Sequence, residues 1–166
     1  MWLSTDHVAT LRIRKVLKEL KQVKDLMSTN CKTVTLQDNV YEVAVIMAQN
    51  DVGFVPVVET HDSAKLIGAI TDRDLVVRGY AQKKQGSSSV SEVMSDALVT
   101  VSSTTDAEEA ADIMAAHQIR RLPVVDDGRL VGVISLGDLA LGNTTSRDAG
   151  QALSEISEHE NQNAVH

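Results

Sequence analysis

The chain carries Val55-Pro56-Val57-Val58-Glu59 and, after residues 60–65, Leu66-Ile67-Gly68-Ala69-Ile70-Thr71-Asp72-Arg73-Asp74-Leu75. It repeats this stretch as Leu122-Pro123-Val124-Val125-Asp126 and, after residues 127–129, Leu130-Val131-Gly132-Val133-Ile134-Ser135-Leu136-Gly137-Asp138-Leu139. Short apolar, β-branched runs bounded by turn residues predict buried strands. Each copy therefore predicts two strands, at residues 54–58 and 66–70 in the first and at 121–125 and 130–134 in the second.

Each copy ends on a hydroxyl residue three positions before an aspartate, as Thr71 before Asp74 and Ser135 before Asp138. This pattern is typical of a capping box at the start of a helix. The sequence thus predicts closing helices over residues 72–78 and 136–141, which end at glycines 79 and 142.

The similarity between the copies extends beyond the strands. Residues 23–59 align with residues 90–126 without a gap, and the aligned pairs include Met27-Ser28 with Met94-Ser95, Thr33-Val34 with Thr100-Val101, and Ile46-Met47-Ala48 with Ile113-Met114-Ala115. The copies differ in length only at the hairpin turn, where residues 60–65 correspond to residues 127–129. Surface turns tolerate such insertions. The chain is therefore built from two related units.

Each unit also predicts a short β-prone run, at residues 33–36 in the first, followed by a helix. Asn39 stands three residues before Glu42, ahead of an apolar face formed by Val43, Ile46 and Met47. Asp106 and Glu109 have the same spacing in the second unit. Both pairs are helix start signals.

These elements divide the chain into an N-terminal helix (1–22), repeat 1 (23–78), a linker (79–89), repeat 2 (90–141) and a polar tail with a short helix (142–166). The N-terminal helix is basic and amphipathic, with an apolar stripe of Ile13, Val16, Leu17 and Leu20. We expect the stripe to pack on the module or on a second subunit; an anionic membrane or a partner protein is the alternative. The Gly/Ser-rich linker predicts a flexible connection.

Composition narrows the class of protein. The 166 residues carry a net charge of −7, which opposes general affinity for nucleic acid. The sequence shows neither a membrane-spanning apolar run nor a secretory signal, so we expect a soluble, cytoplasmic protein. Cys31 is the single cysteine, and the histidines have no spacing typical of a metal site. We therefore expect no metal and no required cofactor.

The duplicated order, with its Pro-Val-Val strand and its Gly-x-Ile-[Thr/Ser]-x-x-Asp ending, resembles the tandem cystathionine β-synthase (CBS) domain, or Bateman module, over residues 23–140. The resemblance implies an α/β fold of two βαββα repeats packed about a pseudo-twofold axis, with a cleft on each side, and a homodimer. It also implies a non-catalytic sensor of energy state or metabolites that binds AMP, ADP, ATP or S-adenosylmethionine and controls a protein partner in trans.

The same resemblance places the ribose and phosphate contacts at Thr71 and Asp74 in repeat 1 and at Ser135 and Asp138 in repeat 2. A carboxylate can accept hydrogen bonds from both ribose hydroxyls, and free amides at a helix start favour phosphate. It places adenine against the first two strands of each repeat, at Thr33, Val34, Val55, Thr100, Val101 and Leu122. The alternative is that these residues only cap helices and fill the core.

Arginines distinguish the two repeats. Arg120 and Arg121 resemble the phosphate-facing segment of nucleotide-binding CBS repeats, whereas repeat 1 has Gly53 and Phe54 at those positions. Arg73 of repeat 1 corresponds to a glycine in repeat 2. Arginine matches phosphate geometry and stays charged. We therefore predict unequal phosphate affinity in the two clefts.

Two other function classes remain open. The Thr71-Asp72-Arg73-Asp74 cluster could be taken for a site of metal-assisted hydrolysis, but no nucleophile with a positioned base accompanies it. The other alternative is an interaction or scaffold protein with empty clefts, which acts through its N-terminal helix and dimer surfaces.

Overall fold

The computed structural model describes residues 21–141, so the polar tail and nearly all of the predicted basic N-terminal helix lie outside the described residues. The described chain divides into two compact units. One contains residues 28–103 and 121–133, and the other contains residues 21–27, 104–120 and 134–141. We call them the hairpin unit and the helical unit.

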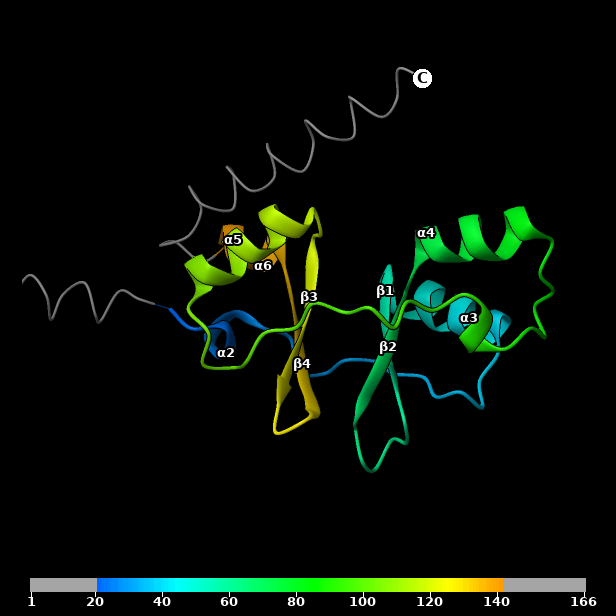
Figure 1. The fold of residues 1–166 in the computed structure, drawn as a ribbon, viewed down its shortest axis with the longest axis horizontal. Coiled ribbons are helices and arrows are strands. Elements are labelled where there is room, and N and C mark those ends of the chain that lie inside the picture. Colours follow the sequence, from blue (N-terminus) through cyan, green and yellow to red (C-terminus); the bar gives the residue numbers. More distant parts are fainter. Residues whose placement is uncertain (1–20, 142–166) are drawn as a thin grey trace, which may run out of the picture. The chain divides into compact units, whose positions relative to one another are not determined.

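The first hairpin of the hairpin unit consists of β1 (Phe54–Val58) and β2 (Leu66–Thr71), which pair antiparallel (Figure 1). Both strands match their predicted positions to within one residue. The predicted β-prone run at residues 33–36 forms no strand. Instead, Val34 makes one parallel bridge to Val57, in which Val34 N–H donates to Pro56 O at 3.1 Å and Val58 N–H donates to Val34 O at 2.8 Å.

The second hairpin consists of β3 (Arg121–Asp126) and β4 (Arg129–Ser135), and the last two residues of β4 belong to the helical unit. Its turn, Asp127-Gly128, has positive φ at both residues (49° and 77°), as a tight two-residue hairpin requires. Val101 bridges Val124 in parallel, at positions equivalent to Val34 and Val57. The two repeats therefore build the same three-segment arrangement.

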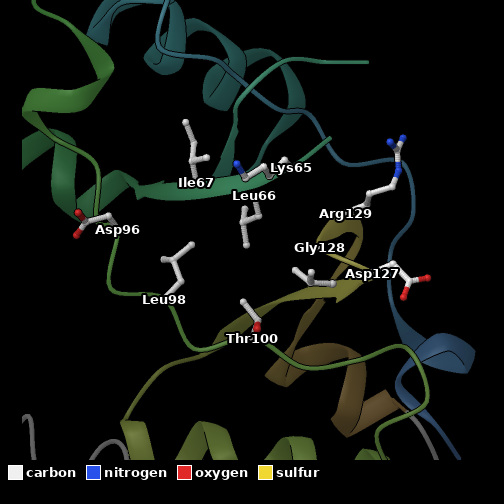
Figure 2. A pocket seen from close by; sticks show the side chains of 10 residues that line it. Lys65, Leu66, Ile67, Asp96, Leu98, Thr100, Asp127, Gly128 and Arg129 are labelled. Atoms are coloured by element: carbon white, nitrogen blue, oxygen red, sulfur yellow. The ribbon is translucent and has the colours of Figure 1, made fainter. Parts of the chain in front are cut away.

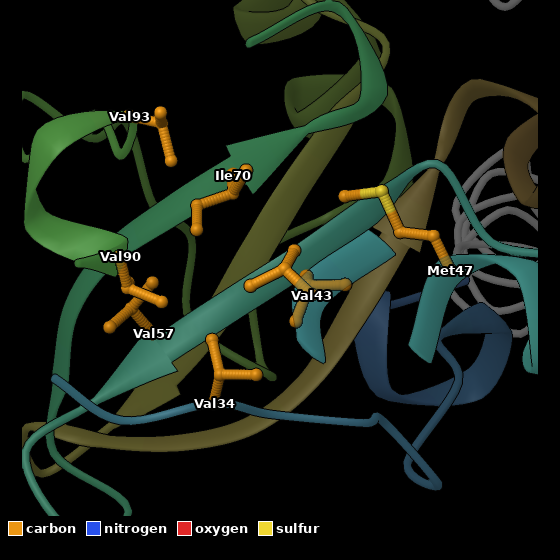
Figure 3. Packing of buried hydrophobic residues seen from close by; sticks show 8 residues of the cluster. Val34, Val43, Met47, Val57, Ile70, Val90 and Val93 are labelled. Carbon is orange, nitrogen blue, oxygen red and sulfur yellow. The ribbon is translucent and has the colours of Figure 1, made fainter. Parts of the chain in front are cut away.

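Helix α3 (Val40–Asn50) begins with the predicted capping box. Glu42 N–H donates to Asn39 Oδ1 at 3.0 Å, and Asn39 N–H donates to Glu42 Oε2 at 2.8 Å. The helix contacts β1 and contributes Val43 and Met47 to a buried cluster with Val34, Val55, Val57, Ile70, Val90 and Val93. Figure 3 shows this aliphatic cluster around the first hairpin.

The first closing helix is longer than predicted. It starts as α4 (Asp72–Asp74), continues as a π-helical turn, η1 (Leu75–Gly79), and ends in a 3₁₀ turn, η2 (Tyr80–Gln82). The predicted stop at Gly79 is therefore wrong. Tyr80 N–H donates to Leu75 O in the π turn, which carries the chain past the glycine to the left-handed Lys83.

The linker is hydrogen-bonded to α3 rather than free. Tyr41 N–H donates to Gly86 O at 2.9 Å, and Val40 N–H donates to Ser88 O at 3.0 Å. The chain then enters a 3₁₀ turn, η3 (Val90–Glu92), capped by Ser89. These contacts satisfy amides at the start of α3, which its own helical bonds leave unpaired.

The helical unit contains α2 (Val23–Leu26), α5 (Ala107–His117) and α6 (Leu136–Leu141). Helix α5 is predicted correctly, but its N-cap Asp106 makes no side-chain capping bond. Instead, Ala107 N–H donates to Lys21 O at 2.9 Å. None of the described helices has the length and apolar character needed to cross a membrane. The predicted mixed α/β fold is confirmed.

Candidate ligand cavities

The Thr71–Asp74 pair forms a closed hydrogen-bond ring at the start of α4. Thr71 N–H and Thr71 Oγ1 donate to Asp74 Oδ2 at 2.8 and 2.9 Å, and Asp74 N–H donates to Thr71 Oγ1 at 3.1 Å. Asp74 Oδ1 lies 3.6 Å from Arg78 Nε. The predicted cap is therefore present, and it uses one of the two carboxylate oxygens.

Ser135 and Asp138 repeat this arrangement at the start of α6. Ser135 N–H donates to Asp138 Oδ2 at 2.8 Å, and Asp138 N–H donates to Ser135 Oγ at 3.1 Å. Both residues are partly exposed. The sequence signal thus predicts both local structures correctly.

The aliphatic residues assigned to adenine lie in the core. Val34, Val55, Val101 and Leu122 are all buried. The N–H and C=O groups of Val34 already bond to β1, and those of Val101 bond in the same way to Pro123 O and Val125 N–H. Core packing explains the burial of these four side chains, and the parallel bridges already use the main-chain N–H and C=O groups of Val34 and Val101.

The three arginines of the predicted phosphate sites are all exposed. Arg73 lies in the first turn of α4, and Arg121 begins β3. The carbonyl of Arg120 accepts a hydrogen bond from Leu136 N–H at 2.8 Å. None of the three lines either cavity described below.

The hairpin unit contains a cavity of about 450 Å³, here called the large cavity. Its lining combines apolar walls with charged ends and consists of Lys65, Leu66, Ile67, Asp96, Leu98, Thr100, Val125, Asp127, Gly128 and Arg129. Figure 2 shows Leu66 directed towards the chain segment that carries Leu98 and Thr100. Asp96 lies at one end of the cavity and Arg129 at the other. Thr100 is the one predicted site residue that it contains.

A second cavity in this unit, here called the small cavity, has a volume of about 170 Å³. It is lined by Thr29, Cys31, Thr33, Val58, His61, Ala64, Leu130, Val131 and Gly132. His61 Nδ1 lies 3.1 Å from Thr33 Oγ1, within hydrogen-bonding distance. Cys31 Sγ donates to Ser28 O at 3.1 Å, and burial raises the pKa of this thiol. Thr33 is the predicted site residue found here.

The two cavities occupy equivalent places in the two repeats. The pairs Thr29 and Asp96, Cys31 and Leu98, Thr33 and Thr100, and Val58 and Val125 are each separated by 67 positions, the same offset that aligns residues 23–59 with residues 90–126. The duplication of the sequence is thus also a duplication of cavities.

Sequence reasoning missed the residues that the hairpin turns contribute to the large cavity. Lys65 and Arg129 form an antiparallel bridge, Leu130 N–H donates to Ala64 O at 2.8 Å, and Arg129 donates to Asp62 O at 3.2 Å. The signal was present, because a basic residue precedes each Leu-[Ile/Val]-Gly strand start. It indicates two cations beside the large cavity.

In the described part of the chain, no group of three or more His, Cys, Asp or Glu side chains is placed to hold a metal ion. In the large cavity, two cations and two carboxylates balance one another. Lys65 also lies 3.4 Å from Glu59. The arrangement suits a ligand with an apolar, flat part and polar ends.

Comparison with known proteins identifies the family. The CBS domain matches residues 23–79 and 90–141. The CBS domain-containing protein YhcV of Bacillus subtilis (strain 168) is 45% identical over 142 residues, covering 86% of this chain and 99% of that protein. The uncharacterized protein YlbB of the same organism is 44% identical over 142 residues, covering 86% and 95%.

Among solved structures, the CBS domain pair of protein MJ0100, in complex with 5′-methylthioadenosine and S-adenosyl-L-methionine, is similar with a TM-score of 0.66 and 28% identity. The match covers 74% of this chain and 94% of that one. The two matched segments, the duplicated hairpins and this structural similarity agree, and the chain belongs to the CBS domain family.

Proposed function

We propose that the chain is a non-catalytic regulatory module that binds an adenosine-containing ligand in the large cavity. The observation that carries the proposal is this cavity itself, since about 450 Å³ lies within the range of about 300–1,000 Å³ typical of ligand sites. Leu66, Leu98 and Val125 offer aliphatic walls for a flat base. The complex of MJ0100 with 5′-methylthioadenosine and S-adenosyl-L-methionine supports the same ligand class.

The charges of the lining favour ligands of low net charge. Lys65 and Arg129 are balanced by Asp96 and Asp127, so the cavity offers no excess of positive charge to a triphosphate. S-adenosylmethionine, 5′-methylthioadenosine and AMP are therefore favoured over ADP and ATP, and the module is a metabolite sensor more than a sensor of ATP.

As a separate proposal, which does not place them at the large cavity, Ser135 and Asp138 are ribose contacts, as the family resemblance implies for repeat 2. Asp138 Oδ2 receives the capping bond from Ser135 N–H, and one carboxylate can accept further hydrogen bonds. Capping and ribose binding are thus compatible in one side chain. Arg120 and Arg121 remain proposed contacts for a phosphate.

A homodimer is proposed as the form in which the module acts on its partner protein. Three apolar side chains are exposed along η1 and η2: Val76 (60%), Val77 (47%) and Tyr80 (86%). Tyr80 follows Val77 by three residues and Val76 by four, so its side chain lies near both along this helical segment. Sedimentation velocity should show a dimer that Val76→Lys converts to a monomer, with Leu36→Lys, an exposed residue elsewhere, as the control.

Thermal melting with an adenosine panel tests ligand binding. A ligand at 100 times its dissociation constant adds about 2.7 kcal/mol of stability. At this chain length each kcal/mol raises Tm by roughly 2–4 °C. We expect S-adenosylmethionine, 5′-methylthioadenosine or AMP to raise Tm and guanosine monophosphate to leave it unchanged. The absence of any shift with every adenosine compound would favour the interaction protein with empty clefts.

A further inference from the structure

We propose that the module binds one adenosine ligand per chain, in the large cavity, and that His61 closes the equivalent small cavity of repeat 1. This inference rests on the proposed function and adds to it the stoichiometry and the residue that sets it. It follows from the unequal sizes of the two cavities and from the contact between His61 and Thr33 in the small cavity.

The volumes decide which cavity can hold the ligand. The large cavity, at about 450 Å³, is of ordinary ligand-site size, whereas the small cavity, at about 170 Å³, falls below the lower bound of about 300 Å³ for such sites. Equivalent residues line both, so the difference does not come from a different architecture.

The hairpin turn accounts for the difference. In repeat 1 this turn is three residues longer, and it places His61 in the cavity lining, 3.1 Å from Thr33 Oγ1. In repeat 2 the short Asp127-Gly128 turn makes no hydrogen bond to Thr100 in the described part of the chain, and Thr100 is exposed whereas Thr33 is partly buried. His61 therefore covers Thr33, whereas the turn of repeat 2 leaves the equivalent Thr100 exposed.

The longer turn is internally bonded, which fixes the place of His61. Ser63 N–H donates to Thr60 Oγ1 at 3.0 Å, and Ala64 N–H donates to Thr60 O at 3.0 Å. Ala64 takes a left-handed conformation (φ 51°), and its carbonyl accepts Leu130 N–H. The His61–Thr33 contact is thus made from an ordered turn anchored at its end.

Cys31 provides a probe of the small cavity, because it is the chain's single cysteine and lines that cavity. Its rate of reaction with a thiol reagent reports whether the cavity is open. The experiment measures this rate with N-ethylmaleimide, and the stoichiometry of S-adenosylmethionine and of AMP by equilibrium dialysis. Four chains are compared: the wild type, His61→Ala, His61→Gln and Asp62→Ala.

In the wild type we expect one ligand per chain and no protection of Cys31 by ligand. His61→Ala should react about tenfold faster, because the local opening step is removed. It should also bind a second ligand, which then protects Cys31. His61→Gln retains a polar group that can reach Thr33 and should behave like the wild type. Asp62→Ala, in the same turn, should do so too, since Asp62 contributes its main-chain oxygen to the structure.

Two ligands per wild-type chain, ligand protection of wild-type Cys31, or equal Cys31 reaction rates in wild type and His61→Ala would overturn the inference while leaving the proposed function intact. Absence of binding by both compounds to every chain would instead overturn the proposed function, and the one-ligand stoichiometry with it.

Discussion

Replacement of Asp74 by alanine removes the acceptor at the centre of the α4 cap. Two donors of Thr71, its N–H at 2.8 Å and its hydroxyl at 2.9 Å, lose Asp74 Oδ2. Loss of a helix cap costs about 0.5–2 kcal/mol, and bonds to a charged group lie at the upper end of such values. The pair with Arg78 adds little, because that side chain is 48% exposed. We expect a loss of about 1–2 kcal/mol.

The matched variant is Asp74→Asn, which keeps one carbonyl oxygen to accept Thr71 N–H. Its loss should stay below about 1 kcal/mol, since one neutral hydrogen bond replaces a charged one. Urea unfolding followed by far-UV circular dichroism measures both free energies of unfolding. At this chain length the alanine variant should also melt about 2–8 °C lower than the wild type.

Equal free energies of unfolding for Asp74→Ala and the wild type would refute the reasoning, because the cap would then contribute nothing to stability. Measuring the ligand affinity of the same variants separates the structural role of each aspartate from its role in binding. If Asp138 holds a ribose, as proposed separately for repeat 2, Asp138→Asn should weaken adenosine binding by about tenfold or more, the cost of one charge-assisted hydrogen bond, whereas Asp74→Asn should leave it unchanged. Equal effects of the two asparagine variants would contradict this assignment.

Three further predictions follow from packing and charge. Gly68→Ala should lower the free energy of unfolding by about 1–3 kcal/mol in urea titrations, because its Cβ would lie 2.8 Å from Met94 Sδ and 3.1 Å from the main-chain oxygen of Ser95; unchanged stability would mean that both neighbours move freely. Hydrogen bonds from Ser103 hold the pKa of Asp126 below its ordinary value, so the stability that they contribute is present above about pH 4 and is lost as pH falls through the folded-state pKa; unfolding free energies of Asp126→Asn should depend less on pH in that window, and an unaltered profile would reject the assignment. Leu98→Trp should fill the large cavity and abolish the ligand-induced rise in Tm, and a retained rise would place the ligand elsewhere.

The strands and helix starts could be predicted because they depend on local patterns. Apolar runs between turn residues identified β1 and β2 to within one residue, and the Asn39–Glu42 spacing identified the start of α3. The internal duplication strengthened these predictions, because the same pattern of strands and helix starts occurs in both copies. These signals act within a few residues of chain.

The features that were missed depend on contacts between distant residues. His61 stands in a surface turn, and nothing local indicates its contact with Thr33, 28 residues away. In the same way, the cap of α5 comes from the carbonyl of Lys21 rather than from Asp106. The family resemblance implies a cleft on each side of the module, but the sequence could not predict the sizes of the two cavities. We propose that the hairpin turn sets these sizes, and the sequence shows only the length of that turn.

Photolabelling with 8-azidoadenosine 5′-monophosphate, followed by peptide mapping, tests most directly whether adenosine occupies the large cavity. The account predicts that label suppressed by excess AMP falls on residues 96–100 or 65–67, which line that cavity. Competed label confined to other segments, or label that AMP does not suppress, would contradict it.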